Sequence, residues 1–282
     1  MEQIITNAMI TEYKEFLIDE EKGSVTIDKY IRDILAFKEW LSDRQLDKTA
    51  VLEYKQRLID CYSPATVNSV LSSLNGFFMH NEWFGLRAKS LKIQRKIFCR
   101  PETELTKAEY ENLLRAAKHK HNERLYLVMQ TICSTGIRVS ELNFITVEAV
   151  KEKIGQVKMK GKIRTVLLPK ELCTLLMKYA KEQEIKSGCI FITKSGKPLD
   201  RSNIWADMKK LCELAGVARE KVFPHNLRHL FARTYYSIQK DIVRLADILG
   251  HSNVNTTRIY TIENGEIHRQ QIQHLGLVCM RI

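Results

Sequence analysis

The sequence predicts a mainly helical protein of two domains, with one small antiparallel sheet in the second domain. Its 282 residues are enough for two domains that each bury a core of their own. Apolar residues recur at helical spacing along most of the chain, and the period changes to that of strands only within residues 154–168. A change of charge along the chain separates the two domains.

That charge distribution also indicates what the protein binds. The whole chain carries a formal net charge of +12. Residues 1–85 carry a net −5, residues 86–100 hold six basic and no acidic residues, and residues 101–282 carry a net +11. We therefore expect a first domain at 1–85, a basic linker at 86–102 and a second domain from 103 to the last residue. The excess of positive charge favours a polyanionic partner, nucleic acid first.

Composition excludes several classes of protein. Hydrophobic residues make up 44% and charged residues 28% of the chain, as in folded globular proteins. No apolar run approaches the roughly 18 residues of a membrane span, and the N-terminus lacks the basic region of a signal peptide. Seven cysteines are scattered without a Cys-x-x-Cys pair, which argues against a disulfide scaffold or a zinc finger. We expect reduced thiols, a cytoplasmic location and no contact with membranes.

The first domain is expected to be helical. Val25, Ile34 and Phe37 belong to an apolar stripe that predicts a helix ending near Leu41. A helix at Thr49–Ile59 follows, and the next begins after Ser63-Pro64, because proline is favoured in a first helical turn. Four aromatic residues are expected in the core, namely Phe77, Phe78, Trp83 and Phe84.

The second domain begins with a capping-box pattern. Thr106 and Glu109 precede an amphipathic helix, and an apolar helix at Leu125–Thr135 ends at Gly136. Residues 154–169 then read as strand, glycine-containing basic turn and strand, which predicts a hairpin. Further helices are expected over Lys170–Glu184, Ser202–Ala215, Asn226–Ser237 and Ile242–Leu249.

Four clusters of chemistry-bearing residues stand in this second domain. They are Arg138 within Ser134-Thr-Gly-Ile-Arg-Val-Ser-Glu-Leu142, Lys160 at the hairpin tip, His225-Asn-Leu-Arg228-His229, and Gly250-His251 followed by Tyr260. Pro224 places His225 in the first turn of a helix, and i, i+3 spacing puts Arg228 on the same face. Each cluster alone is ordinary for a basic protein.

Together and in this order, the clusters resemble the catalytic set of the tyrosine recombinase, or phage integrase, family. The nearest resemblance is to compact bacterial Xer-like members. It implies a two-domain, C-shaped clamp in which residues 1–85 form a SAM-like core-binding domain and the chain from residue 103 forms the catalytic domain. The first domain carries the matching pattern Thr26, Tyr30, Phe37 and Trp40.

The resemblance implies a mechanism that the residue types support. Tyr260 would attack a DNA phosphodiester and leave a 3′-phosphotyrosine. Arg138 and Arg228 would grip the non-bridging oxygens, and Lys160 would protonate the leaving 5′-oxygen. His225 and His251 would bind the same phosphate, with His225 also helping to accept the tyrosine proton. No cluster of Asp and Glu suits two metals, so neither a metal nor another cofactor is expected.

Residues beside these motifs receive supporting roles. Glu141 is expected to orient Arg138 through an i, i+3 ion pair, and His229 to pack behind the site. Tyr235 and Tyr236 are rival nucleophiles by residue type, but their position within a helix favours packing. DNA contacts are expected from the linker and the hairpin, at Lys92, Arg95, Lys96, Lys162 and Arg164.

The remaining expectations concern partners. Residues 262–282 keep a short apolar stripe with Ile272, Leu275 and Cys279, and the resemblance implies an exchange helix that docks into a neighbouring subunit. The alternative is a helix folded back on its own domain. The resemblance further implies double-stranded recombination sites, a tetramer on DNA and, in a bacterium, association with the nucleoid. Directionality would come from an accessory DNA-bending protein or a partner recombinase.

Two other functions remain open at this point. A DNA-binding regulator without catalysis would also be basic, and Ile242–Thr261 can be read as a helix-turn-helix. A topoisomerase would use the same tyrosine chemistry. The complete catalytic set argues against the regulator, and the first domain favours recombination over topoisomerisation. Integration, excision, inversion and resolution share one active site, so the sequence does not separate them.

Overall fold

The computed structural model describes residues 3–93, 101–159, 162–193, 195–260, 273–275 and 277. The chain divides into two compact units, Met1–Arg95 and Lys96–Ile282, which are described separately. The predicted fold class is confirmed, because the described residues are mainly helical with one two-stranded antiparallel sheet.

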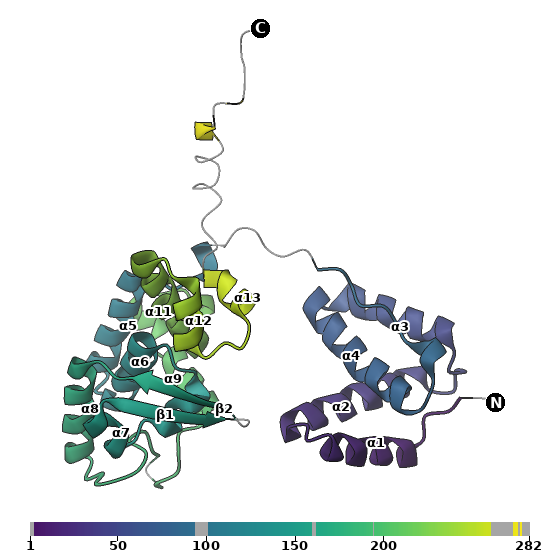
Figure 1. Cartoon of the computed structure of the whole chain (residues 1–282), viewed down its shortest axis with the longest axis horizontal. Helices are drawn as coiled ribbons and strands as arrows, with labels where there is room; N and C mark the ends of the chain where they lie inside the picture. The colour runs from purple at the N-terminus through teal and green to yellow at the C-terminus, as the bar shows by residue number, and fades with distance from the viewer. Residues whose placement is uncertain are drawn as a thin grey trace. The chain divides into compact units, whose positions relative to one another are not determined.

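The first unit is a bundle of helices (Figure 1). Its elements are α1 (Asn7–Asp19), α2 (Ser24–Leu41), α3 (Lys48–Cys61), α4 (Pro64–His80) and the 3₁₀ helix η1 (Phe84–Leu86). The Ser63 side chain caps α4 as expected, with Pro64 in the first turn. Helices α2 and α4 pack together around Phe37, Phe77 and Phe78, all fully buried.

The prediction is wrong for one of the four aromatic residues expected in the core of this unit. Phe84 is 61% exposed, whereas Trp83 packs against the core as predicted. The physical reason is that α4 ends at His80, so Phe84 lies in η1 and leaves the apolar stripe of the helix.

The start of the basic segment is anchored on the first unit. The Asn75 side chain donates to the carbonyl of Ala88 and accepts from its N–H, both at 2.9 Å. Asn68 makes the same pair of bonds with the backbone of Leu91, at 2.9 and 2.7 Å. The first compact unit accordingly extends to Arg95, beyond the charge boundary at residue 85.

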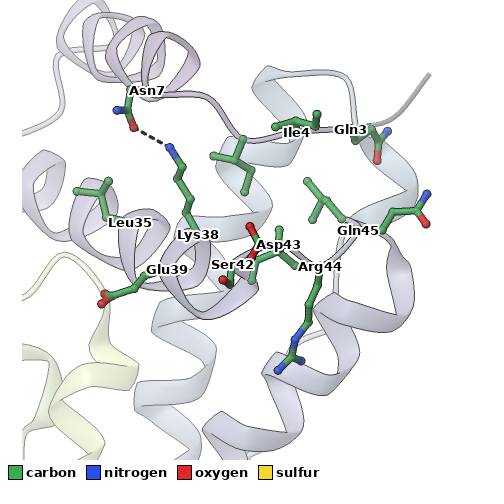
Figure 2. A pocket seen from close by; sticks show the side chains of 13 residues that line it. Gln3, Ile4, Asn7, Leu35, Lys38, Glu39, Ser42, Asp43, Arg44 and Gln45 are labelled. Atoms are coloured by element: carbon green, nitrogen blue, oxygen red, sulfur yellow. Dashed lines mark hydrogen bonds between the residues drawn. The ribbon is translucent and has the colours of Figure 1, made fainter.

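The first unit also has a surface hollow of about 810 Å³, shown in Figure 2. Its walls are the N-terminal arm, the end of α2 and the loop that follows. Lys38 Nζ donates to Asn7 Oδ1 at 2.7 Å across it, and the exposed side chains of Ile4 and Leu35 face it. None of the candidate catalytic residues lines this hollow.

The second unit surrounds a larger core. Its elements are η2 (Pro101–Thr103), α5 (Lys107–His119), α6 (Glu123–Thr135), η3 (Val139–Phe144), α7 (Val147–Glu152), β1 (Ile154–Met159), β2 (Lys162–Leu167), α8 (Lys170–Glu182), α9 (Arg201–Lys209), α10 (Cys212–Ala215), η4 (Arg219–Lys221), α11 (Pro224–Gln239), α12 (Ile242–Leu249), α13 (Val254–Thr257) and η5 (Arg258–Tyr260). In Figure 1 the hairpin lies beside α7, which it contacts.

Local sequence explains the elements that carry the site. The capping box of Thr106 and Glu109 is confirmed at the start of α5. Helix α6 ends at Gly136, which has φ +66°, and a Cβ there would overlap the ring of Phe231 on α11. Glycine therefore allows α6 and α11 to approach closely.

The hairpin and the helices after it follow the prediction with one exception. Strands β1 and β2 are antiparallel, with Ile154 opposite Leu167 and Val157 opposite Arg164. The helix expected over Ser202–Ala215 is interrupted between α9 and α10. There the N–H of Leu211 bonds the carbonyl of Met208, three residues back, which tightens the turn. Among the described residues, no helix is long and apolar enough to cross a membrane.

Candidate active site

Arg138 is placed where α6 turns into η3. Its backbone N–H donates to Glu141 Oε2 at 2.7 Å, and its Nη1 donates to Glu141 Oε1 at 2.9 Å. The Arg138 side chain is 41% exposed, whereas that of Glu141 is 2% exposed. The buried carboxylate thus holds the arginine at the surface in one orientation, as the i, i+3 spacing predicted.

Glu141 stays ionised because two arginines surround it. Burial raises its pKa, but the Arg138 N–H and the Arg164 guanidinium outweigh burial and lower the pKa below its ordinary value. Arg164 Nη2 donates to Glu141 Oε2. The carboxylate is therefore a fixed negative charge beneath Arg138.

Arg228 is the most buried cation of the site, at 1% exposure. It lies on α11 and donates from Nη1 to the carbonyl of Gly136 and from Nη2 to that of Leu249, the latter at 2.7 Å. Burial and the nearby Arg138 lower its pKa to about 10, so it remains protonated at neutral pH. Its Nε has no hydrogen-bond partner among the described residues.

His251 connects Arg228 to α13. Arg228 Nη2 lies 3.1 Å from His251 Nε2, and His251 Nδ1 lies 2.8 Å from Thr257 Oγ1. Because the guanidinium only donates, this network assigns Nε2 as the acceptor and Nδ1–H as the donor to Thr257. Burial, followed by Arg228, lowers the His251 pKa to about 4, which favours the neutral imidazole.

His225 and His229 stand one turn apart on α11. Their ring centroids are 4.4 Å apart, and the His229 ring meets the Tyr260 ring edge to face at 4.9 Å. His225 is exposed, while His229 is half-buried and its Nε2 has no hydrogen-bond partner among the described residues. Burial, His225 and Arg228 together lower the His229 pKa to about 4. His229 packs against Tyr260.

Tyr260 closes the cluster from the end of η5. It is 4% exposed and packs with Leu245 and Leu249 of α12. Burial raises its pKa, and the charge of Arg228 opposes that increase. The rivals Tyr235 and Tyr236 are half-buried and pack against the same small core, as expected for helix residues with a structural role.

Chain segments far apart in sequence thus meet in one place. A cavity of about 640 Å³ is lined by Arg138, His225 and Arg228, and α9 adds Arg201 and Trp205 to its wall. Sequence reasoning missed these two α9 residues and Thr257. Of these three residues, only Thr257 had a signal in the sequence, because it follows His251 by six residues. The site presents guanidinium and imidazole groups, which suit a phosphate group.

Several predicted site residues lie either outside the described residues or away from the expected DNA-contacting surface. Lys160, Arg95 and Lys96 lie outside the described residues, as do the side chain of Lys162 and most of the segment 262–282. Lys92 is exposed on the first unit. Arg164 is 13% exposed and directed inward to Glu141, a placement that does not favour the expected DNA contact. Across the described residues, no group of three or more His, Cys, Asp or Glu side chains is arranged to hold a metal ion.

Acidification is expected to destabilise the second unit through its histidines. The folded pKa values of His229 and His251 are about 4, against an ordinary 6.5. Between these values the unfolded chain binds protons that the folded one excludes, so stability is lost as pH falls from 6.5 to 4. The free energy of unfolding changes by at most about 1.4 kcal/mol per pH unit for each histidine. The change is smaller where the histidine side chain is partly exposed to solvent.

Urea unfolding at stepped pH measures this slope. The variant carrying His229→Gln and His251→Gln should have a flatter profile between pH 6.5 and 4. An equally steep profile in that variant would assign the acid sensitivity to other groups.

Sequence comparison matches both units to known domains. The model described as "Phage integrase family" matches residues 103–266, and the one described as "Phage integrase, N-terminal SAM-like domain" matches residues 10–83. The tyrosine recombinase XerH of Campylobacter jejuni is 31% identical over 262 residues, which cover 83% of this chain and 72% of the relative. XerA of Thermococcus kodakarensis is 30% identical over 90% of each chain.

Solved structures share the fold. The XerA recombinase has 26% identity and a TM-score of 0.53, covering 96% of this chain and 98% of its own. A lambda integrase dimer bound to a COC′ core site has a TM-score of 0.73 at 18% identity, over 90% of this chain and 94% of that one. XerH bound to its difH substrate has a TM-score of 0.69 at 23% identity, over 92% and 83%.

Proposed function

Because this chain belongs to the phage integrase family of tyrosine recombinases, we propose that Tyr260 is the nucleophile with which it cleaves DNA. The protein is a tyrosine-type, site-specific DNA recombinase. The observation that carries the assignment of Tyr260 is its position beside Arg228, His229 and His251, within one cluster of donors. Tyr235 and Tyr236 lie on α11 and lack the spacing to the Gly250-His251 motif.

The reaction exchanges the DNA phosphodiester for a phosphotyrosine ester, so the energy of the broken bond is kept for rejoining. The Tyr260 oxygen forms a bond to phosphorus as the bond to the 5′-oxygen breaks, leaving a 3′-phosphotyrosine and a free 5′-hydroxyl. His225 helps to accept the tyrosine proton, and Lys160 gives a proton to the leaving oxygen. Attack by a 5′-hydroxyl from another strand reverses these steps and rejoins the DNA.

The cations stabilise charge on the phosphate. Arg138 and Arg228 bind the non-bridging oxygens, which gain charge in the pentavalent transition state. His251 then needs a proton on Nε2 to donate to the phosphate, whereas in the free protein Nε2 accepts from Arg228. Tyr260 is 4% exposed in the free protein, so its side chain becomes more accessible when DNA binds.

We further propose how the chain holds its substrate. Residues 1–85 and the catalytic domain from residue 103 form a clamp around a double-stranded recombination site, joined by the linker at 86–102. Lys92, Arg95, Lys96 and Lys162 contact phosphates. Four subunits assemble on DNA, as four lambda integrase subunits do on a Holliday junction. The segment 262–282 is exchanged between neighbouring subunits. The site of action is the bacterial cytoplasm, at the nucleoid.

Covalent capture tests this function. The wild-type protein is incubated with duplexes that carry a randomised target stretch and a nick beside each possible cleavage point. The nick releases a short fragment, so the phosphotyrosine cannot be resealed. We expect an adduct that survives denaturation, and sequencing of its DNA identifies the target site.

Two readouts separate the alternative functions, namely survival of the adduct and strand exchange at the recovered site. A regulator would retain DNA only until denaturation and would yield no adduct. A topoisomerase would relax a supercoiled plasmid without exchanging strands between two copies of the recovered site. Either outcome would contradict a recombinase.

A further inference from the structure

Arg164 lies on the face of β2 that is directed into the second unit. Its cross-strand partner Val157 and its neighbour two residues on, Val166, are both 3% exposed. Ile163, on the other face of the strand, is 67% exposed. The alternation of a strand therefore turns the Arg164 side chain inward, and that side chain is 13% exposed.

The two terminal nitrogens of Arg164 bind two different segments. Nη2 donates to Glu141 Oε2, the oxygen that also accepts the backbone N–H of Arg138. Nη1 donates to the carbonyl of Ile248 at 2.5 Å, in the last turn of α12. One guanidinium thus joins η3 to α12 from a position on the hairpin.

The stem of Arg164 packs against the turn that carries His251. Gly250 has φ +63°, and a Cβ at this position would overlap Cδ of Arg164. The next carbonyl after that of Ile248, that of Leu249, accepts from Arg228. Arg164 and Arg228 therefore bind consecutive carbonyls at the end of α12, immediately before His251.

We propose that Arg164 is a positioning residue for DNA cleavage, which fixes Arg138 through Glu141 and His251 through the end of α12. This inference rests on the proposed function. In this role Arg164 makes an internal contact in place of the phosphate contact expected from the sequence. The same contacts tie the hairpin that bears Lys160 to the remainder of the site. Arg164 touches none of the reacting atoms.

The side-chain chemistry requires an arginine at this position. The two acceptors lie in different segments, and a guanidinium offers two separate terminal nitrogens in a planar fork. A lysine has one terminal nitrogen, so Arg164→Lys keeps the charge but loses the simultaneous bonds to Glu141 and Ile248. The lysine variant should fall between the wild type and Arg164→Ala.

The test uses the duplex recovered by covalent capture with the wild-type protein. For each variant we measure the Kd for that duplex, its dependence on salt and the rate of adduct formation at saturating DNA. Arg164→Ala should lower the saturating rate about 100-fold, the usual effect of a misplaced catalytic group, with a Kd within about twofold of the wild type. Arg164→Lys should recover part of the rate.

Lys158→Ala is the matched control. Lys158 is exposed on the outer face of the same hairpin, opposite Ile163, so this variant removes the same charge without touching the network. Its saturating rate should equal that of the wild type. Thermal unfolding of each variant identifies any loss of folded protein, and Arg164→Lys keeps the test valid if Arg164→Ala does not fold.

Three results would overturn the proposal. A weaker Kd with a salt slope reduced by about one and an unchanged saturating rate would make Arg164 a phosphate contact. Full wild-type rates in both Arg164 variants would show that Arg164 has no role in DNA cleavage. Failure of the wild-type protein to form any adduct would contradict the proposed function itself, and the positioning role with it.

Discussion

The Tyr260→Phe protein is expected to bind its DNA site as tightly as the wild type and to form no covalent complex with it. The phenylalanine keeps the ring that packs on Leu249 and His229, so the fold should be unchanged. Only the hydroxyl is removed, and no other group can then form the ester with phosphorus. Gel electrophoresis under denaturing conditions measures the adduct, and a filter-binding titration measures the affinity.

The matched controls are Tyr235→Phe and Tyr236→Phe. Both tyrosines lie on α11 beside the same small core and should be dispensable for cleavage. If either control lost the adduct while Tyr260→Phe retained it, the nucleophile would be misassigned.

Glu141→Ala is expected to cause the largest loss of stability among single substitutions at the site. The substitution removes a carboxylate that is 2% exposed and leaves Arg164, 13% exposed, without its ionic partner. Breaking a buried pair from one side costs about 3–5 kcal/mol, because a charge remains unpaired out of water. The free energy of unfolding in urea should fall by that amount, and adduct formation should fall with it because Arg138 loses its orientation.

Glu182→Ala is the comparison for an exposed pair. Glu182 Oε1 lies 3.8 Å from Lys178 Nζ, and both side chains are more than half exposed. Its removal should change stability by less than about 0.5 kcal/mol. Equal effects of the two substitutions would show that burial of Glu141 is not what makes its ion pairs important.

Much of the fold was predictable from local signals, and the exceptions have physical causes. The capping box at Thr106, the helix end at Gly136 and the hairpin depend on neighbours in sequence, so they could be predicted. Helix α1 was not expected. Its buried residues Ile10 and Tyr13 have helical spacing, but the exposed Phe16 and Ile18 obscure the stripe.

The site was predictable in its residue types but not in its contacts. Arg138 and Glu141 are three residues apart, so their pair could be predicted from spacing. The acceptors of Arg228 are backbone carbonyls that carry no sequence signal. Arg164 was expected to contact DNA because it is basic, whereas the alternation of its strand directs it to Glu141.

Mapping the covalent bond between protein and DNA identifies the nucleophile. The adduct formed on the nicked duplex is digested with nuclease and protease, and the peptide that carries the residual nucleotide is sequenced by mass spectrometry. We predict a 3′-nucleotide on Tyr260. A nucleotide on Tyr235, Tyr236 or any other side chain would contradict the account.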